Sequence, residues 1–135
     1  MKPNLEIVIG NAGADCVAIR PGSGYSDEGW MTAEVRVQCD GWHGRFNTDF
    51  MRGELNRLAR ELWGLRDTLR GEARFEPLEH QLMLVFQGDG KGHIKVSGNA
   101  VNVHSSGTHL SFELELDQSH LVRIIRGLEE ADPAS

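Results

Sequence analysis

Apolar residues recur at helical spacing between positions 48 and 70 of the chain. The stripe consists of Met51, Leu55, Leu58, Leu62, Leu65 and Leu69, widened on one flank by Ala59 and Trp63. Spacings of three and four residues place such side chains on one face of an α-helix. Thr48 or Asp49 can cap the start of this helix, and Gly71 stands where a left-handed residue would end it. The pattern predicts one long central helix.

Residues 30–46 alternate between apolar and polar side chains on either side of the dipeptide Asp40-Gly41. This dipeptide is a strong signal for a two-residue hairpin turn, because both central positions of that turn favour a positive φ. The sequence therefore predicts a β-hairpin whose register follows from the turn. The expected cross-strand pairs are Cys39 with Trp42, Gln38 with His43, Val37 with Gly44, Arg36 with Arg45, and Val35 with Phe46. The first, third and fifth pairs are expected to face the core, and the tryptophans to help fill it.

Shorter alternating segments predict further strands at 5–9, 16–20, 73–75, 81–86, 94–103 and 110–116. Asp117 or Ser119 can then cap a short C-terminal helix whose apolar residues point inward. The predicted fold class is α+β. It comprises a curved, mostly antiparallel sheet of seven or eight strands packed on one long central helix, with a short C-terminal helix.

The chain of 135 residues fits one domain over 1–135, with an ordered core at about 5–128 and a frayed tail at 129–135. Its hydrophobic fraction of 39% and charged fraction of 25% exclude an intrinsically disordered chain. No apolar run approaches the roughly 20 residues of a membrane span. The N-terminus also lacks the apolar core of a signal peptide. We therefore expect a cytoplasmic protein without a membrane association.

The two cysteines, Cys16 and Cys39, fit that compartment as reduced core residues. A disulfide between them on adjacent strands is the alternative. They have no CxxC spacing, and the sequence therefore predicts no zinc site.

The net charge of −6 argues against general binding to nucleic acids or anionic membranes. Six acidic residues lie between position 113 and the end, against only Arg123 and Arg126. Such a segment is either a solvated face or a surface for a basic partner. The candidate partner-binding residues are Glu113, Glu115 and Asp117, on the last strand and at the start of the last helix.

No catalytic constellation emerges from the sequence. There is no Gly-x-Ser-x-Gly elbow, and neither cysteine falls at a predicted helix start. His104 and His109 flank a turn, but two imidazoles without a third ligand do not define a metal site. Together with His43 they are the candidate polar groups of a pocket between helix and sheet. The sequence identifies no catalytic residue, metal or cofactor.

Several segments carry a family resemblance: WMTAEVRV at 30–37, GWHG at 41–44, EL at 54–55, LSFEL at 110–114 and DQSHL at 117–121. Over roughly residues 5–128 the chain resembles small bacterial proteins of unassigned function related to the WapI-type immunity proteins. This resemblance implies a cytosolic protein that binds and neutralises a cognate toxin, often a nuclease delivered by a neighbouring cell. It supplies no binding residues for named positions of this sequence.

Three hypotheses follow. The first is a non-enzymatic cytosolic binding protein, an immunity-type inhibitor whose acidic surface meets a basic protein toxin. The second is a small-ligand-binding or enzymatic domain with a pocket between helix and sheet. The third is a structural subunit that forms a homodimer through an exposed sheet edge. A flat acidic face would favour the first hypothesis, and a closed, histidine-lined pocket would favour the second.

Overall fold

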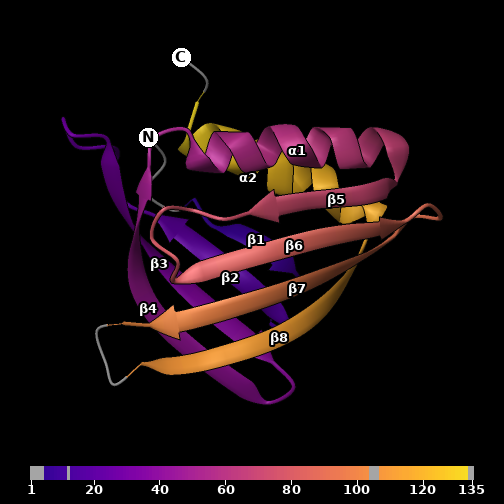
Figure 1. The fold of residues 1–135 in the computed structure, drawn as a ribbon, viewed down its shortest axis with the longest axis horizontal. Coiled ribbons are helices and arrows are strands. Elements are labelled where there is room, and N and C mark those ends of the chain that lie inside the picture. The colour runs from indigo at the N-terminus through magenta and orange to yellow at the C-terminus, as the bar shows by residue number, and fades with distance from the viewer. Residues whose placement is uncertain (1–4, 12, 104–106, 134–135) are drawn as a thin grey trace.

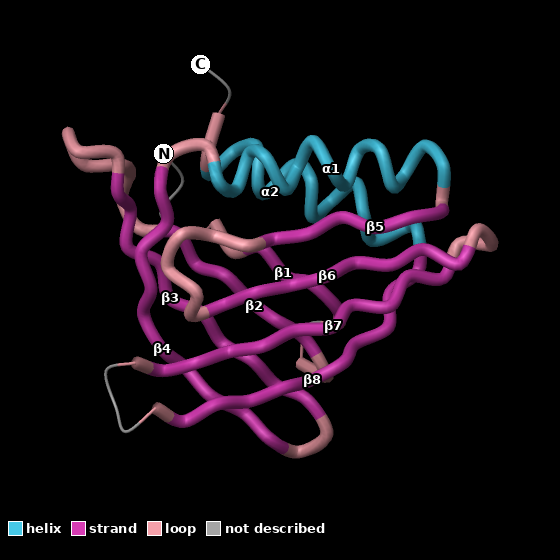
Figure 2. Tube along the Cα trace, viewed as in Figure 1, coloured by secondary structure: helices cyan, strands magenta, loops and turns pink. Residues whose placement is uncertain are grey.

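The computed structural model describes residues 5–11, 13–103 and 107–133. Among these residues, eight strands form two four-stranded antiparallel sheets, and two α-helices lie along one side of them (Figures 1 and 2). The first sheet contains, in spatial order, β1 (Ile7–Gly10), β2 (Cys16–Pro21), β3 (Trp30–Cys39) and β4 (Trp42–Met51). The second contains β5 (Arg70–Phe75), β6 (Leu82–Asp89), β7 (His93–Asn102) and β8 (Thr108–Asp117). The helices are α1 (Glu54–Thr68) and α2 (Leu121–Ala131), and a 3-10 turn, η1 (Gln118–His120), precedes α2.

The prediction of one curved sheet on one long central helix is wrong. The eight strands divide equally between two sheets, and the longer helix, α1, has only 15 residues. The expected caps Thr48 and Asp49 lie instead within β4, opposite Ala33 and Thr32 of β3. Met51 ends β4, so its helical spacing to the leucines of α1 is coincidental.

Backbone conformation sets the two ends of α1. Gly53 precedes the helix and has a left-handed φ of 96°. This change of backbone direction separates α1 from β4. At the other end, Leu69 is already left-handed at φ 60°, and its N–H donates to the Leu65 carbonyl. The helix therefore stops two residues before the predicted position, Gly71.

The two sheets turn their apolar faces toward a common core, and in Figure 1 the strands of one cross those of the other at an angle. This arrangement results from the alternation of apolar and polar side chains along each strand. In β6, for example, Leu82, Leu84 and Phe86 are fully buried. The buried cluster also includes leucines of both helices and two isoleucines of α2. Among the described residues, no helix has the length and apolar character needed to cross a bilayer.

The helices cover the same side of both sheets, where β1 and β5 form the edges. The Glu61 carboxylate of α1 accepts a hydrogen bond of 2.9 Å from the Arg74 backbone N–H of β5. On α2, Gly127 packs so closely on Ile7 of β1 that a Cβ there would lie 3.0 Å from its side chain. In the part of the chain that the structure describes, no helix packs along the edges at β4 and β8, on the opposite side.

The predicted hairpin register is confirmed. The structure pairs Cys39 with Trp42, Val37 with Gly44 and Val35 with Phe46 around the Asp40-Gly41 turn. The predicted inward position of Trp42 is wrong, because its side chain is 70% exposed. Phe46 is the first residue of β4 that the core buries, so the β4 side of the hairpin tip is exposed, whereas Cys39 on the β3 side belongs to the core.

Asp132 joins the end of α2 to the start of α1. Its Oδ2 accepts hydrogen bonds from the backbone N–H groups of Gly53, at 2.8 Å, and Asn56, at 3.0 Å. The Asn56 side-chain amide donates in return to the Asp132 carbonyl, at 2.9 Å. Helix α1 has no capping side chain at its own N-cap residue. The Asp132 carboxylate, which is distant in the sequence, therefore accepts the hydrogen bonds of the N–H groups at the start of the helix. Helix α2 runs to Ala131, and Asp132 follows it directly as its C-cap residue.

Replacing Asp132 with alanine should lower the free energy of unfolding by about 1–3 kcal/mol, because two N–H groups of α1 lose a charged acceptor. Urea denaturation followed by circular dichroism measures the change. The matched control is Glu115→Gln, which removes one exposed charge and should stay within about 0.5 kcal/mol of the parent protein. Equal stability of Asp132→Ala and the control would contradict the assigned cap.

Candidate functional site

The acidic residues of β8 lie on the outer face of the second sheet. Phe112, Leu114 and Leu116 point into the core, so the intervening Glu113 and Glu115 point to solvent. The Glu113 side chain is 65% exposed, and its Oε1 lies 4.0 Å from the Nζ of Lys95. Lys95 on β7 is directly opposite Glu115. The structure therefore brings these two predicted residues together on one face, beside a single lysine.

Asp117, the third predicted acid, has a local structural role. Its Oδ1 accepts a hydrogen bond of 2.7 Å from the Ser119 backbone N–H, which caps η1. Hydrogen bonds from the Ser119 side chain and backbone lower the pKa of this carboxyl, with a smaller contribution from the charge of His120. Asp117 is exposed, as are the other two acids, but part of its carboxylate is already engaged.

The predicted histidines do not form one cluster in the described structure. His43 is exposed on β4, opposite Gln38, whereas His109 is exposed on β8, in the other sheet. The His109 Nε2 lies 3.1 Å from the Asn99 Oδ1. His104 lies outside the described residues.

A hollow of about 610 Å³ does lie between α1 and β5, but a different histidine, His80, lines it. The Glu54 and Glu61 carboxylates, which line this hollow, already have partners. Glu54 accepts backbone hydrogen bonds from Met51 and Leu78, at 2.6 and 2.7 Å. Glu61 accepts from the Arg74 backbone and lies 3.5 Å from the Arg57 guanidinium. These acids therefore hold the strands and loops around α1.

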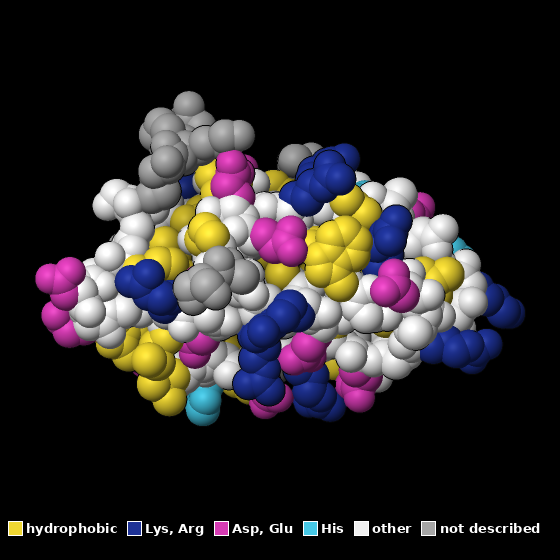
Figure 3. Space-filling view, turned by 90° about the horizontal axis from the view of Figure 1, so that it is seen from above, with side chains coloured by type: hydrophobic (Ala, Val, Ile, Leu, Met, Phe, Trp, Pro, Cys, Tyr) yellow, Lys and Arg dark blue, Asp and Glu magenta, His cyan; other side chains and the backbone are white. Residues whose placement is uncertain are grey.

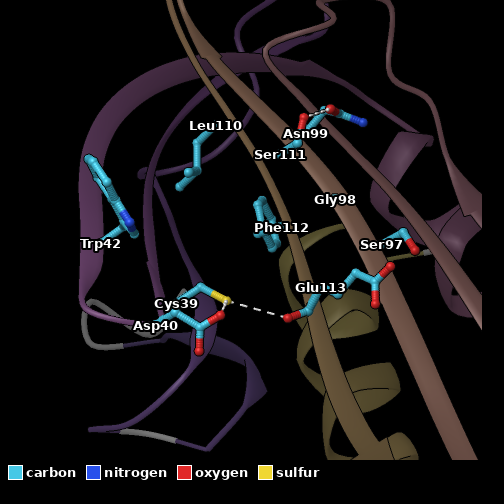
Figure 4. Close-up of a pocket in the computed structure, with 10 residues that line it drawn as sticks. All are labelled: Cys39, Asp40, Trp42, Ser97, Gly98, Asn99, Leu110, Ser111, Phe112 and Glu113. Atoms are coloured by element: carbon cyan, nitrogen blue, oxygen red, sulfur yellow. Dashed lines mark hydrogen bonds between the residues drawn. The ribbon is translucent and has the colours of Figure 1, made fainter.

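A second hollow, of about 620 Å³, opens where the β3–β4 hairpin meets β8 (Figure 4). We call it the hairpin cleft. The first sheet contributes Cys39, Asp40 and Trp42, and the second contributes Ser97, Gly98, Asn99, Leu110, Ser111, Phe112 and Glu113. Figure 4 shows the side chains of Trp42, Leu110 and Phe112 around the opening.

Gly98 gives the Phe112 ring its place in the hairpin cleft. A Cβ at position 98 would lie 2.3 Å from the Phe112 Cζ, so the ring rests directly on the β7 backbone. A smaller hollow of about 180 Å³, which also includes Leu110, continues between the two sheets. Phe46 and Arg45 of β4 line this second part. The hollows therefore extend along the side of the molecule that the helices leave uncovered.

Cys39 joins the two sheets at the hairpin cleft. Its thiol donates to the Glu113 backbone carbonyl at 3.3 Å. The carboxylates of Asp15 and Asp40 each lie 3.9 Å from its sulfur. Burial raises the pKa of the Cys39 thiol, and the charges of these carboxylates raise it further. Cys39 is thus a protonated donor near neutral pH, and both it and Cys16 are free cysteines.

Asp15, Cys39 and Asp40 also offer three ligand atoms within 4.8 Å of one another, a geometry that could hold a metal ion. The sequence-based prediction of no metal site considered the spacing of the cysteines and the pair of histidines, His104 and His109. It could not find this group, because Asp15 comes from the β1–β2 connection and meets the hairpin only in the folded chain. A thiolate ligand would require loss of the Cys39 proton, which the two carboxylates oppose.

The raised pKa of Cys39 predicts a pH dependence. In a Cys16→Ser variant, thiolate absorbance in the ultraviolet should rise at a pH above about 8.5, the ordinary cysteine pKa. Because the folded state holds this proton more tightly, its stabilising effect is complete below that pH and declines as the pH rises. Asp15→Asn should shift the titration toward lower pH, and the control Asp27→Asn, in an exposed loop, should not. Equal titration of both variants would contradict the electrostatic explanation.

A comparison with known protein families gives independent information about the chain. The model of the Immunity protein WapI-like family matches residues 7–131. The match therefore includes every strand and both helices, together with the acidic face of β8 and the hairpin cleft. No curated protein matches the chain.

Proposed function

The chain belongs to the Immunity protein WapI-like family, and from this premise we propose that it is a non-enzymatic inhibitor that binds and neutralises a bacterial protein toxin. Family membership indicates an immunity-type function. An inhibitor of this kind acts in the cytosol, where it meets the toxin. It requires a complementary surface and no catalytic group.

The observation that carries the proposal is the acidic face of β8 within the matched region. Glu113 and Glu115 project side by side from a regular strand, so the backbone that carries them needs no ordering step on binding. The exposed pair of Glu113 with Lys95, at 4.0 Å, contributes little by itself, so these acids are available to a cationic partner. Together with the net charge of −6, this face would attract a basic toxin.

The helix face is a weaker candidate for the same partner. Figure 3 shows Lys and Arg side chains interspersed with Asp and Glu on the side that carries α1 and α2. Several of these charges lie in pairs, such as Arg57 with Glu61 and Arg66 with Asp67. A surface with interspersed positive and negative charges creates no strong electric field that would attract one kind of partner. The charge distribution therefore favours the acidic face of β8 as the binding surface.

The hollow between α1 and β5 supports a second candidate function, the binding of a small ligand. His80 and Arg57 line it and could meet a polar or anionic molecule. The open edges at β4 and β8 would serve a homodimer in the third hypothesis. Neither alternative accounts for the acidic face.

The test is a binding assay between the purified protein and a toxin encoded beside it in its native genome. Charge reversal by Glu113→Lys with Glu115→Lys should weaken the complex tenfold or more, about 1.4 kcal/mol, and added salt should reduce the difference. The matched control, Asp27→Lys with Glu28→Lys, changes the net charge equally in an exposed loop.

Three results decide the proposal. Selective weakening by the β8 variant supports both the inhibitor function and the surface. Equal weakening by the two double variants would show a general charge effect and remove β8 as the contact. Absence of any complex, together with a small molecule retained through purification, would favour the hollow between α1 and β5 instead.

A further inference from the structure

We propose that the hairpin cleft receives a basic side chain of the protein partner, an arginine or lysine that stacks on Trp42 and pairs with Asp40. This inference rests on the proposed inhibitor function for the partner's class. Glu113 belongs to both the acidic face and the lining of the cleft, whereas Trp42 and Asp40 lie outside the acidic face, and Glu115 and Asp117 do not line the cleft.

Trp42 is held in an exposed position by the hairpin geometry. The Asp40-Gly41 turn pairs it with Cys39, and its side chain is 70% exposed. Across the described residues, Trp42 makes no ring contact and no side-chain hydrogen bond. Trp63 differs on both counts, since its indole N–H donates to Glu129 and the Arg66 guanidinium lies 5.4 Å from its ring. Trp42 thus has a free face for the same kind of cation.

Tryptophans left exposed on a rigid strand are typical anchors of protein interfaces. Burying such a ring removes a large apolar area from water, at a small loss of side-chain freedom. Leu110 and Phe112 extend the apolar lining from Trp42 into the hairpin cleft. The aliphatic part of an arginine or lysine would contact these side chains, while its charged end reaches the polar rim.

The polar rim carries uncompensated negative charge. Asp40 lines the hairpin cleft, and its backbone N–H donates to the Asp15 Oδ1 at 3.2 Å, so the two residues are neighbours. Throughout the described part of the chain, neither carboxylate lies within 4.0 Å of a lysine, arginine or histidine nitrogen. Glu6, by contrast, pairs with Arg36 at 2.6 Å. A cation from outside would relieve the repulsion between Asp15 and Asp40.

The position of the hairpin cleft favours a protein over a second copy of this chain. The cleft lies on the side that the helices leave uncovered, where β8 is a sheet edge. Antiparallel pairing of two β8 edges would bring Glu113 and Glu115 of one copy close to those of the other, which is unfavourable. Each copy also carries a net charge of −6. Arg45 lines the adjoining smaller hollow, so the partner's cation belongs at the Trp42 end.

Two variants test the contact in the toxin complex. Trp42→Ala removes the stacking surface, and Asp40→Asn removes the charge while keeping a residue that tolerates the observed φ of 51°. Each should weaken toxin binding by about tenfold or more without changing the unfolding midpoint. The matched control is Leu78→Ala, because Leu78 is 63% exposed but does not line the cleft. It should leave the affinity unchanged.

A second measurement does not require the toxin. The indole N–H resonances of the protein are followed by NMR while acetyl-Gly-Arg-Gly-amide is added, with the isosteric citrulline peptide as the uncharged control. The Trp42 resonance, assigned from Trp42→Phe, should shift with the arginine peptide and much less with the citrulline peptide. Asp40→Asn should reduce the shift.

The two measurements separate the inference from the proposed function. A complex that tolerates Trp42→Ala and Asp40→Asn overturns the inference and leaves the inhibitor function standing. Failure to bind toxin, with a selective Trp42 shift, overturns the inhibitor function and retains a cation-binding cleft. Absence of both responses overturns both.

Discussion

The hydrogen bonds from Gly53 and Asn56 to the Asp132 carboxylate join the start of one helix to the end of the other, on the side where both helices cover the sheets. Helix α1 begins after a left-handed glycine and has no cap of its own, so its first N–H groups need an acceptor from elsewhere. The acceptor arrives from the end of α2, 79 residues after Gly53. This contact thereby joins the two helices.

The joined helices determine which sheet edges are exposed. They cover β1 and β5, and so the open edges are those of β4 and β8 on the opposite side. An open edge promotes unwanted strand pairing, and outward charges are a common protection against it. Glu113 and Glu115 provide that protection on β8, and the same charges would attract a basic partner. Protection of the edge and the proposed recognition of a toxin therefore place the same requirement on this strand.

Local pattern and turn chemistry predicted the hairpin well. Asp40-Gly41 defines the turn, and every cross-strand pair expected from it is present. The same local reasoning extended the helix too far, because Met51 matches both the alternation of β4 and the spacing of α1. Only the left-handed backbone at Gly53 separates the two elements. The division of the strands into two sheets could not be predicted from the sequence either. Alternation specifies which side chains face a core, but it does not specify how many sheets enclose that core.

By itself, the sequence determined the strands, the hairpin register, the acidic outer face of β8 and the resemblance to an immunity protein family. These features depend on neighbouring residues, through side-chain alternation and turn preference. Tertiary structure alone decided the exposure of Trp42, the meeting of Asp15 with Cys39 and Asp40, and the capping of α1 by Asp132. Each of these depends on residues far apart in the chain, whose contact is set by packing of the whole core.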